Sequence, residues 1–327
     1  MILAPMQGLT EVLFRRVYEE CFPGAITSAV APFIALTRNL RFSTDNDQIA
    51  DVLPENNAGS IPVIPQILGK ESDEFITLSN RLYDLGYNEI NWNMGCPMRA
   101  IAAKHRGSGI LPYPDEVRAI LDKIIPAMKP SLSVKVRLGL KDKNDIFRLV
   151  PVLNDYPLAS VTIHPRLGRQ QYTGQPDLDT FDEVLPLLKP PVIYNGDILT
   201  AADARRIQER FAQVGDLMIG RGVLYNPLLP LEIEDSKMEI DDSAAATGHF
   251  IQRLMEEIML RMPTDESRIR KTKEYWCLLW KSLPISEMQA REVLRESDLQ
   301  TVIKKISYFS VRKDTLPKRV KVIGYRL

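Results

Sequence analysis

One cysteine stands where a strand-like run of the sequence gives way to a loop. Residues 87–93 alternate like a β-strand, and Gly95 and Pro97 interrupt the pattern on either side of Cys96. A lone cysteine is more often an inert apolar residue than a reagent, but flanking glycine and proline are a costly way to hold a core filler. We therefore treat Cys96 as a candidate catalytic thiol just past the C-terminal end of a strand.

Eight short apolar runs, each followed by polar or glycine-containing residues and then a helical pattern, predict the elements that position this thiol. They span residues 2–6, 25–30, 63–68, 88–93, 132–137, 159–164, 191–195 and 215–219. Strands that alternate with helices predict a parallel sheet, and eight units over roughly 230 residues fit an α/β fold, the (β/α)8 TIM barrel. A doubly wound sheet is the competing architecture.

The ends of the expected strands favour the barrel, because a barrel collects its chemistry at the C-terminal ends of many strands. Seven of the eight ends carry polar or glycine signals: Pro5-Met6-Gln7, Gln66, Asn93 with Cys96, Lys135 with Arg137, His164 with Arg166, Asn195-Gly196-Asp197 and Gly220-Arg221-Gly222. A Rossmann fold would need a Gly-x-Gly-x-x-Gly turn after the first strand, and none is there. Lys135 or His164 alone would not indicate a functional site. Polar or glycine residues at the ends of so many expected strands do indicate one, because these ends lie at the same edge of the sheet.

The last two strand ends indicate a phosphorylated ligand. Both glycine-containing segments offer backbone N–H groups shortly before a helix, and Arg221 adds positive charge. Barrels commonly hold a phosphate between the loops after strands seven and eight. The sequence therefore predicts a phosphorylated cofactor across the barrel mouth, with its reactive end near Cys96.

Beyond about residue 235 the strand–helix alternation stops and long helical periodicity begins. We predict two domains, a barrel over residues 1–238 and an all-α helical domain over residues 239–327. Although the net charge of the chain is zero, residues 268–327 hold 15 Lys and Arg against 6 Asp and Glu. This segregation favours contact with a polyanion such as nucleic acid, and a solvated helical face is the alternative.

Composition removes several classes of protein. No apolar run approaches the ~20 residues of a membrane helix, and the first residues resemble a strand rather than a signal peptide, so we expect a cytoplasmic protein. The three cysteines and three histidines are widely dispersed. That spacing predicts neither a disulfide framework nor a metal site.

Taken together, the motifs resemble the tRNA-dihydrouridine synthase family. The resemblance covers nearly the whole chain and rests on seven segments in the family's order: Ala4 to Gly8, Gln66, Asn93 to Pro97, Lys135 to Gly139, His164 to Gly174, Asn195 to Asp197, and Gly220 with Arg221. It implies an FMN-binding barrel whose C-terminal helical domain helps to hold tRNA.

The resemblance also implies roles for individual residues. Pro5, Met6 and Gln7 would line the flavin, Gln66 and Lys135 would contact its polar edge, and His164 would lie beside it. Asn195, Gly196, Asp197, Gly220 and Arg221 would hold its phosphate. The inserted uridine would face Asn93, Arg137, Arg166 and Tyr172, and Lys271 and Lys273 would meet tRNA.

The implied chemistry is reduction of the uracil C5=C6 bond, with hydride passing from reduced FMN to C6. NADPH (or NADH) would reduce the flavin, and Cys96 would protonate C5 as a neutral thiol, which suits an ordinary cysteine pKa of ~8.5. Two departures from the family pattern are Arg99, where relatives often have lysine, and Pro165, where glycine is usual. They affect the substrate position more than the catalytic assignment.

Two other functions compete with this one. An FMN barrel dehydrogenase acting on a free pyrimidine or dihydroorotate would not need so basic a C-terminal segment. A non-catalytic RNA-binding protein would not need Cys96, Lys135 and His164 intact. The short N-terminus is similar to the bacterial position-16 type, and we expect a monomer.

Overall fold

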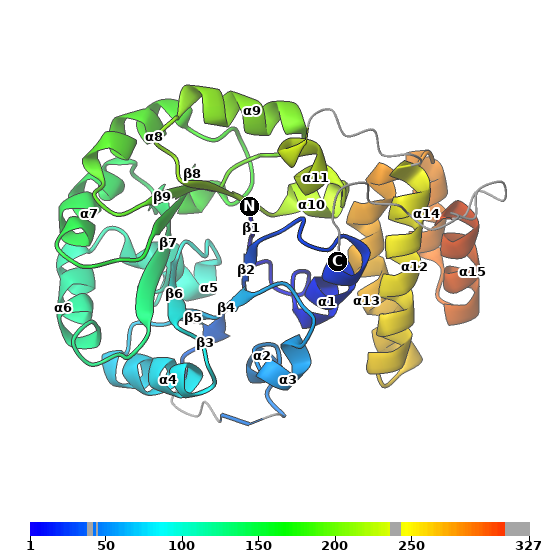
Figure 1. Ribbon diagram of the computed structural model, residues 1–327, viewed down its shortest axis with the longest axis horizontal. Helices are drawn as coiled ribbons and strands as arrows, with labels where there is room; N and C mark the ends of the chain where they lie inside the picture. The colour runs from blue at the N-terminus through cyan, green and yellow to red at the C-terminus, as the bar shows by residue number, and fades with distance from the viewer. Residues whose placement is uncertain (38–41, 44, 236–242, 311–327) are drawn as a thin grey trace.

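The computed structural model describes residues 1–37, 42–43, 45–235 and 243–310. Figure 1 shows a barrel of strands ringed by helices, with a separate group of helices packed against one side. The domain boundary expected after residue 238 lies outside the described residues, as does 311–327, which supplies part of the basic C-terminal segment.

Ten strand segments make up one parallel sheet. They are β1 (Ile2–Leu3), β2 (Ser28–Val30), β3 (Ile34–Ala35), β4 (Val63–Ile64), β5 (Gln66–Leu68), β6 (Glu89–Met94), β7 (Ser131–Gly139), β8 (Val161–Leu167), β9 (Val192–Tyr194) and β10 (Asp216–Ile219). Because β2 pairs with β4 and β3 pairs with β5, these four segments are two barrel strands, each interrupted once. Pro32 and Pro65 lie in the interruptions, where a residue without an N–H cannot continue the ladder.

The sheet closes on itself. β1 pairs with β2 on one side and with β10 on the other, Ile2 lying opposite both Ser28 and Met218. The remaining strands pair in sequence order from β5 to β10. Eight parallel strands in a closed ring confirm the predicted TIM barrel.

Helices cover the outside of the barrel. They are α1 (Val12–Cys21), α2 (Asp47–Ala50), α3 (Pro54–Asn57), α4 (Ser72–Asp84), α5 (Arg99–Ala102), α6 (Pro114–Ile124), α7 (Asn144–Asn154), α8 (Leu178–Val184), α9 (Ala201–Arg210), α10 (Arg221–Tyr225) and α11 (Leu229–Glu234). The helix α6 shows why such segments form: it begins at Pro114, and Val117, Ile120, Leu121 and Ile124 are buried at helical spacing. Short 3₁₀ turns follow the strands at Gly107–Ile110 and Gly168–Gln170.

Four helices form the C-terminal group: α12 (Ser243–Arg261), α13 (Asp265–Leu279), α14 (Glu287–Arg295) and α15 (Leu299–Ser310). Thr264 and Ser286 cap α13 and α14 through their hydroxyls. Trp276 is buried and its indole N–H donates to the carbonyl of Ala290 at 3.0 Å, so this aromatic belongs to the core. Within the described residues, none of the helices has the length and apolar character needed to cross a bilayer.

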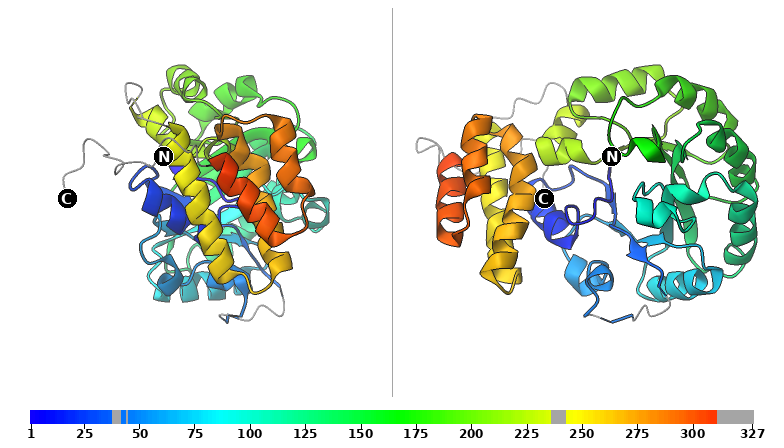
Figure 2. Two further views of the ribbon diagram at one scale, coloured as in Figure 1. Left: turned by 90° about the vertical axis from the view of Figure 1, so that its right-hand side faces the viewer. Right: turned by 180° about the vertical axis from the view of Figure 1, so that it is seen from behind.

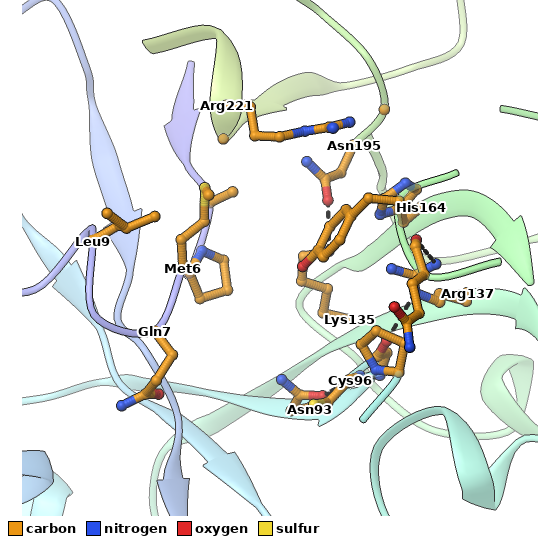
Figure 3. A pocket seen from close by; sticks show the side chains of 18 of the residues that line it. Met6, Gln7, Leu9, Asn93, Cys96, Lys135, Arg137, His164, Asn195 and Arg221 are labelled. Carbon is orange, nitrogen blue, oxygen red and sulfur yellow. Dashed lines mark hydrogen bonds between the residues drawn. The ribbon is translucent and has the colours of Figure 1, made fainter. Parts of the chain in front are cut away.

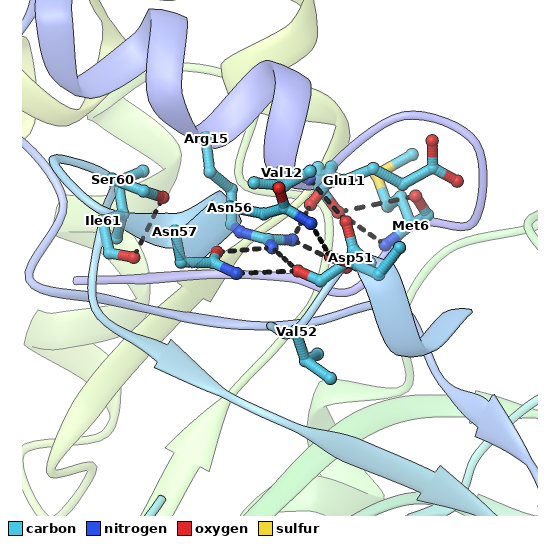
Figure 4. A network of polar contacts seen from close by, with 12 residues as sticks. Met6, Glu11, Val12, Arg15, Asp51, Val52, Asn56, Asn57, Ser60 and Ile61 are labelled. Atoms are coloured by element: carbon cyan, nitrogen blue, oxygen red, sulfur yellow. Dashed lines mark hydrogen bonds and ion pairs between the residues drawn. The ribbon is translucent and has the colours of Figure 1, made fainter. Parts of the chain in front are cut away.

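The helix α1 joins the barrel to this group (Figure 2). Phe14 and Tyr18 on α1 pack against Phe250 on α12, with ring centroids 5.6 and 5.9 Å apart, and Phe14 also stacks on Tyr275 of α13 at 6.0 Å. Beneath them, Arg15 forms a buried ion pair with Asp51 at 3.1 Å (Figure 4). Aromatic pairs contribute about 0.5–1.5 kcal/mol each beyond the area they bury, so the contact between the two parts is substantial.

Candidate active site

A cavity of about 460 Å³ opens at the carboxyl ends of the barrel strands (Figure 3). Residues from seven of the eight barrel strands, or from the segments that interrupt or follow those strands, line it. Such a cavity, apolar over part of its wall and with a few convergent polar groups, is the usual form of a ligand site. Of the predicted site residues, it is lined by Pro5, Met6, Gln7, Asn93, Cys96, Lys135, Arg137, His164, Tyr172, Asn195, Gly196, Asp197, Gly220 and Arg221.

Cys96 is held by the backbone on both sides of it. The Asn93 side-chain oxygen accepts hydrogen bonds from the N–H groups of Gly95 at 3.1 Å and Cys96 at 2.9 Å. The Cys96 carbonyl accepts from the Ser108 N–H at 2.9 Å and from the Ser108 hydroxyl at 3.0 Å. The loop after β6 therefore fixes the thiol.

Gly107 is required for this arrangement. Its φ of +56° lies in the left-handed region, and a Cβ at this position would come within 2.7 Å of the Cys96 carbonyl oxygen. The glycine lets the loop return against the cysteine that the sequence singled out.

The environment of Cys96 favours the neutral thiol. Burial raises the pKa of Cys96, while a backbone hydrogen bond from Met98 and the charge of Arg137 lower it by less. A thiol of this kind stays protonated at neutral pH. It suits a proton donor better than an activated nucleophile.

Arg137 links the cysteine loop to the loop after β8. Its guanidinium donates to the carbonyls of Gly95 at 2.9 Å, Leu167 at 3.1 Å and Gln171 at 2.7 Å. It also lies 5.6 Å from the ring centroid of Tyr172. Since the Tyr172 side chain is 54% exposed, its ring is open to a partner from solvent.

Lys135 projects from β7 into the cavity and donates to the Asn195 side-chain oxygen at 2.6 Å (Figure 3). Asn195 in turn donates to the carbonyl of Met218 at 2.8 Å, which fixes the orientation of its amide. Burial, with a smaller contribution from Arg137, lowers the pKa of Lys135 to about 7.

His164, Arg166, Asp197 and Arg221 form one connected group. Asp197 accepts from Arg166 at 2.8 Å and from Arg221 at 2.6 Å, and these ion pairs lower the pKa of Asp197 although its partial burial raises it. Burial and the surrounding cations hold the pKa of His164 well below its usual range. Arg166 Nη1 lies 3.1 Å from His164 Nε2, and because arginine can only donate, this nitrogen is the acceptor of a neutral imidazole.

Four predicted site residues do not line the cavity. Gln66 is buried below it, where its amide bonds Asn91 and Asn93, each at 2.7 Å. Arg166 is 1% exposed and supports Asp197 from behind. Lys271 and Lys273 lie on α13, and their ammonium groups bind Gly8 and Glu296 within the protein.

Sequence reasoning missed several lining residues, among them Leu9, Pro32, Phe33, Met98 and Gln171. Pro32 and Phe33 lie between β2 and β3, in the interruption of the second barrel strand, directly after the one predicted strand (residues 25–30) whose end carried no named signal. Only polar and glycine signals were sought there, so an apolar contribution to the wall went unnoticed. Gln171 has a φ of +52°, a conformation that no sequence pattern indicated.

The fold and site define a barrel enzyme, because ionisable side chains from separate strands converge on one mouth. Residues 2–302 match the family model described as Dihydrouridine synthase (Dus), and the chain belongs to this family. Since formation of dihydrouridine reduces a uracil ring, the family is one of oxidoreductases.

Curated relatives agree with the family. The chain is 29% identical over 242 residues to tRNA-dihydrouridine synthase B of Pasteurella multocida, covering 74% of this chain and 70% of the relative. It is 27% identical over 304 residues to tRNA-dihydrouridine(16) synthase of Pseudomonas putida, covering 90% and 93%.

Solved structures share the fold. The old yellow enzyme homologue from Zymomonas mobilis matches with a TM-score of 0.52 at 12% identity, over 73% of this chain and 89% of that one. Morphinone reductase matches with a TM-score of 0.51 at 12% identity, over 74% and 88%. At this identity the likeness concerns the barrel alone.

Proposed function

We propose that the protein is an FMN-dependent tRNA-dihydrouridine synthase that reduces the C5=C6 bond of one uridine in tRNA, with NADPH (or NADH) as reductant. The observation that carries the proposal is Cys96, a thiol that burial keeps protonated and that Asn93 and Ser108 hold beside a positively charged cavity. The names of the relatives support tRNA as the substrate.

The cavity fits a flavin mononucleotide. Met6 lies across the cavity from Lys135 (Figure 3), Pro5 adds to the apolar part of the lining, and Arg221 adds a second basic side chain. In the described part of the chain, the N–H groups of Gly196 and Gly222 donate to no protein acceptor, which leaves them free for phosphate oxygens. When bound, FMN would supply the hydride that the reduction needs.

The group around Asp197 would orient the phosphate-binding cation. Asp197 ties Arg221 to the buried Arg166, so the guanidinium of Arg221 is placed before a ligand arrives. Neutral His164 and Lys135 would then face the cofactor, and Gln66 would act through Asn93 rather than by contact.

Cys96 would donate the proton to C5 of the uracil as hydride reaches C6. The S–H bond breaks, a C–H bond forms at C5, and the sulfur is left as a thiolate that solvent reprotonates. The charge of Arg137 favours this thiolate, which lowers the barrier to proton transfer. Tyr172, whose ring centroid lies 5.6 Å from the Arg137 guanidinium and 5.3 Å from that of Arg221, would contact the inserted base through its exposed side.

A uracil within folded tRNA must leave its stack to reach Cys96, at a cost of a few kcal/mol. Basic residues of the C-terminal helical domain would offset this cost through phosphate contacts. The likeness to the Pseudomonas putida position-16 enzyme over most of both chains supports uridine 16 as the first position to examine. The expected monomer, the cytoplasmic location and the domain boundary at residue 238 stay predictions.

A map of dihydrouridine in tRNA by mass spectrometry, from cells with and without the gene, tests the proposal. Loss of dihydrouridine at one position, restored by the wild-type gene and not by C96A, is the expected result. Turnover of free uracil or dihydroorotate by the purified protein, without any RNA product, would instead favour the free-base dehydrogenase.

A further inference from the structure

The turn at residues 6–11, directly after β1, lies between the cavity and the helical domain. Met6, Gln7 and Leu9 line the cavity, on the side facing Arg137 and His164 (Figure 3). The turn is tightly closed, because the N–H groups of Leu9 and Thr10 both donate to the Met6 carbonyl, at 2.9 and 3.0 Å. Its conformation therefore sets one wall of the site.

Three successive carbonyls of this turn each accept a hydrogen bond from a side chain outside it. Lys271 donates to Gly8 at 2.7 Å, Tyr275 to Leu9 at 2.9 Å, and Arg15 to Thr10 at 2.9 Å. Lys271 and Tyr275 both belong to α13. Two of the three donors thus come from the helical domain.

The ammonium of Lys271 is fully committed to these contacts. Besides the Gly8 carbonyl, it lies 3.2 Å from the Glu11 carboxylate and 3.4 Å from that of Glu274, so three acceptors face its three N–H bonds. Glu11 also accepts from the Gly8 N–H at 3.0 Å, which ties the middle of the turn to the carboxylate at its C-terminal end. Only 13% of the Lys271 side chain is exposed.

We propose that Lys271 and Tyr275 are positioning residues that hold the 6–11 turn in place, so that the helical domain shapes the active-site wall directly. In this view Lys271 does not contact RNA phosphate, in contrast to the role that the family resemblance implies. Small displacements of a wall against reacting groups cost large factors in rate. The consequence for catalysis rests on the proposed function, whereas the consequence for the turn does not.

The test compares K271M with R270M. Both substitutions remove one positive charge from adjacent positions of α13, but Arg270 is exposed and makes no contact with the turn. Hydrogen exchange of the amides at residues 6–11, retention of added FMN, and kcat and KM on unmodified tRNA are measured for each. Y275F, which removes only the hydroxyl that binds Leu9, serves if K271M does not fold.

K271M is expected to speed exchange in the turn about tenfold, to weaken FMN retention, and to lower kcat roughly 5- to 20-fold with KM for tRNA within about twofold. R270M is expected to leave exchange and FMN retention unchanged. Unchanged exchange and kcat with a raised KM for tRNA would make Lys271 an RNA contact and overturn the proposal. If the wild-type protein made no dihydrouridine, the proposed function would fail, yet the exchange data would still decide the positioning role.

Discussion

The two sides of the cavity use burial in different ways. Beside β6, burial raises the pKa of one thiol and keeps Cys96 protonated. Beside β7 to β10, burial lowers the pKa values of Lys135 and His164, while Arg166 and Arg221 both form ion pairs with Asp197. The side of the cavity beside β6 therefore carries a protonated thiol. The other side carries basic side chains, with Asp197 as their carboxylate partner.

The difference explains how a single cavity suits both a proton transfer and an anionic ligand. Asp197 is the one carboxylate among the described lining residues, against Lys135, Arg137 and Arg221. A dianionic phosphate would complete that balance, whereas a second cation beside Cys96, in addition to Arg137, would lower the pKa of its thiol.

The largest effect is expected from C96A. Loss of a general acid lowers the rate of dihydrouridine formation about 10²- to 10³-fold, because proton donation of this kind contributes 10²–10⁴-fold. Single-turnover assays on unmodified tRNA measure it. C277A, which removes an exposed thiol on α13, should match the wild type. Full activity of C96A would show that the thiol beside β6 is not the proton donor, and the proposed difference between the two sides of the cavity would then be wrong.

D197N tests the charged side. Without its carboxylate, buried Arg166 keeps an uncompensated charge, and we expect a loss of about 2–3 kcal/mol in the free energy of unfolding. Urea unfolding of D197N is compared with D179N, which removes only an exposed ion pair with Arg210 and should change stability little. Equal losses would contradict the role given to Asp197.

The same substitution has a pH signature. Because the folded pKa of Asp197 is lowered, its contribution to stability is present above the ordinary carboxyl value of ~3.9 and is lost as the pH falls through the lower folded value. The difference in the free energy of unfolding between wild type and D197N, measured by urea unfolding at several pH values, should therefore become smaller in acid.

K135M should stabilise the protein while weakening FMN binding. The pKa of Lys135 is about 7 when folded, so below pH 7 its buried charge opposes folding. The unfolded lysine keeps its proton up to ~10.4, so wild-type stability rises with pH between these values. We expect K135M to gain on the order of 1 kcal/mol at pH 6 and to lose this advantage near pH 10, by thermal unfolding at each pH.

The smallest expected effect is the change of the reaction rate with pH. In the proposed mechanism Cys96 acts as a protonated thiol with a raised pKa, so the single-turnover rate with reduced protein should vary less than about twofold between pH 6.5 and 8.5 and fall only above that range. A rate that rises through pH 8.5 would indicate a reactive thiolate instead.

The strands and their order could be predicted because apolar runs and glycine or proline breaks are local signals. The sequence did not reveal that two strands are split at Pro32 and Pro65, since a proline can end a strand or merely interrupt its ladder. The location of the site at the carboxyl ends of the strands was also predictable, because parallel strands bring these ends to one edge of the sheet.

Which residue contacts which could not be predicted, because the partners are far apart in sequence. Arg166 was expected to face the substrate, yet its pairing with Asp197, 31 residues away, turns it into a support. Lys271 was assigned to tRNA through the family resemblance. Its acceptors lie about 260 residues earlier, at Gly8 and Glu11, beyond the reach of any periodicity.

The aromatic contacts of α1 with α12 and α13 bear on how enzymes of this shape could change substrate. Because Phe14 and Tyr18 seat the helical domain through Phe250 and Tyr275, that domain is not an interchangeable attachment. A chimera that imports α12 to α15 from a relative with another target uridine would need the matching α1 as well.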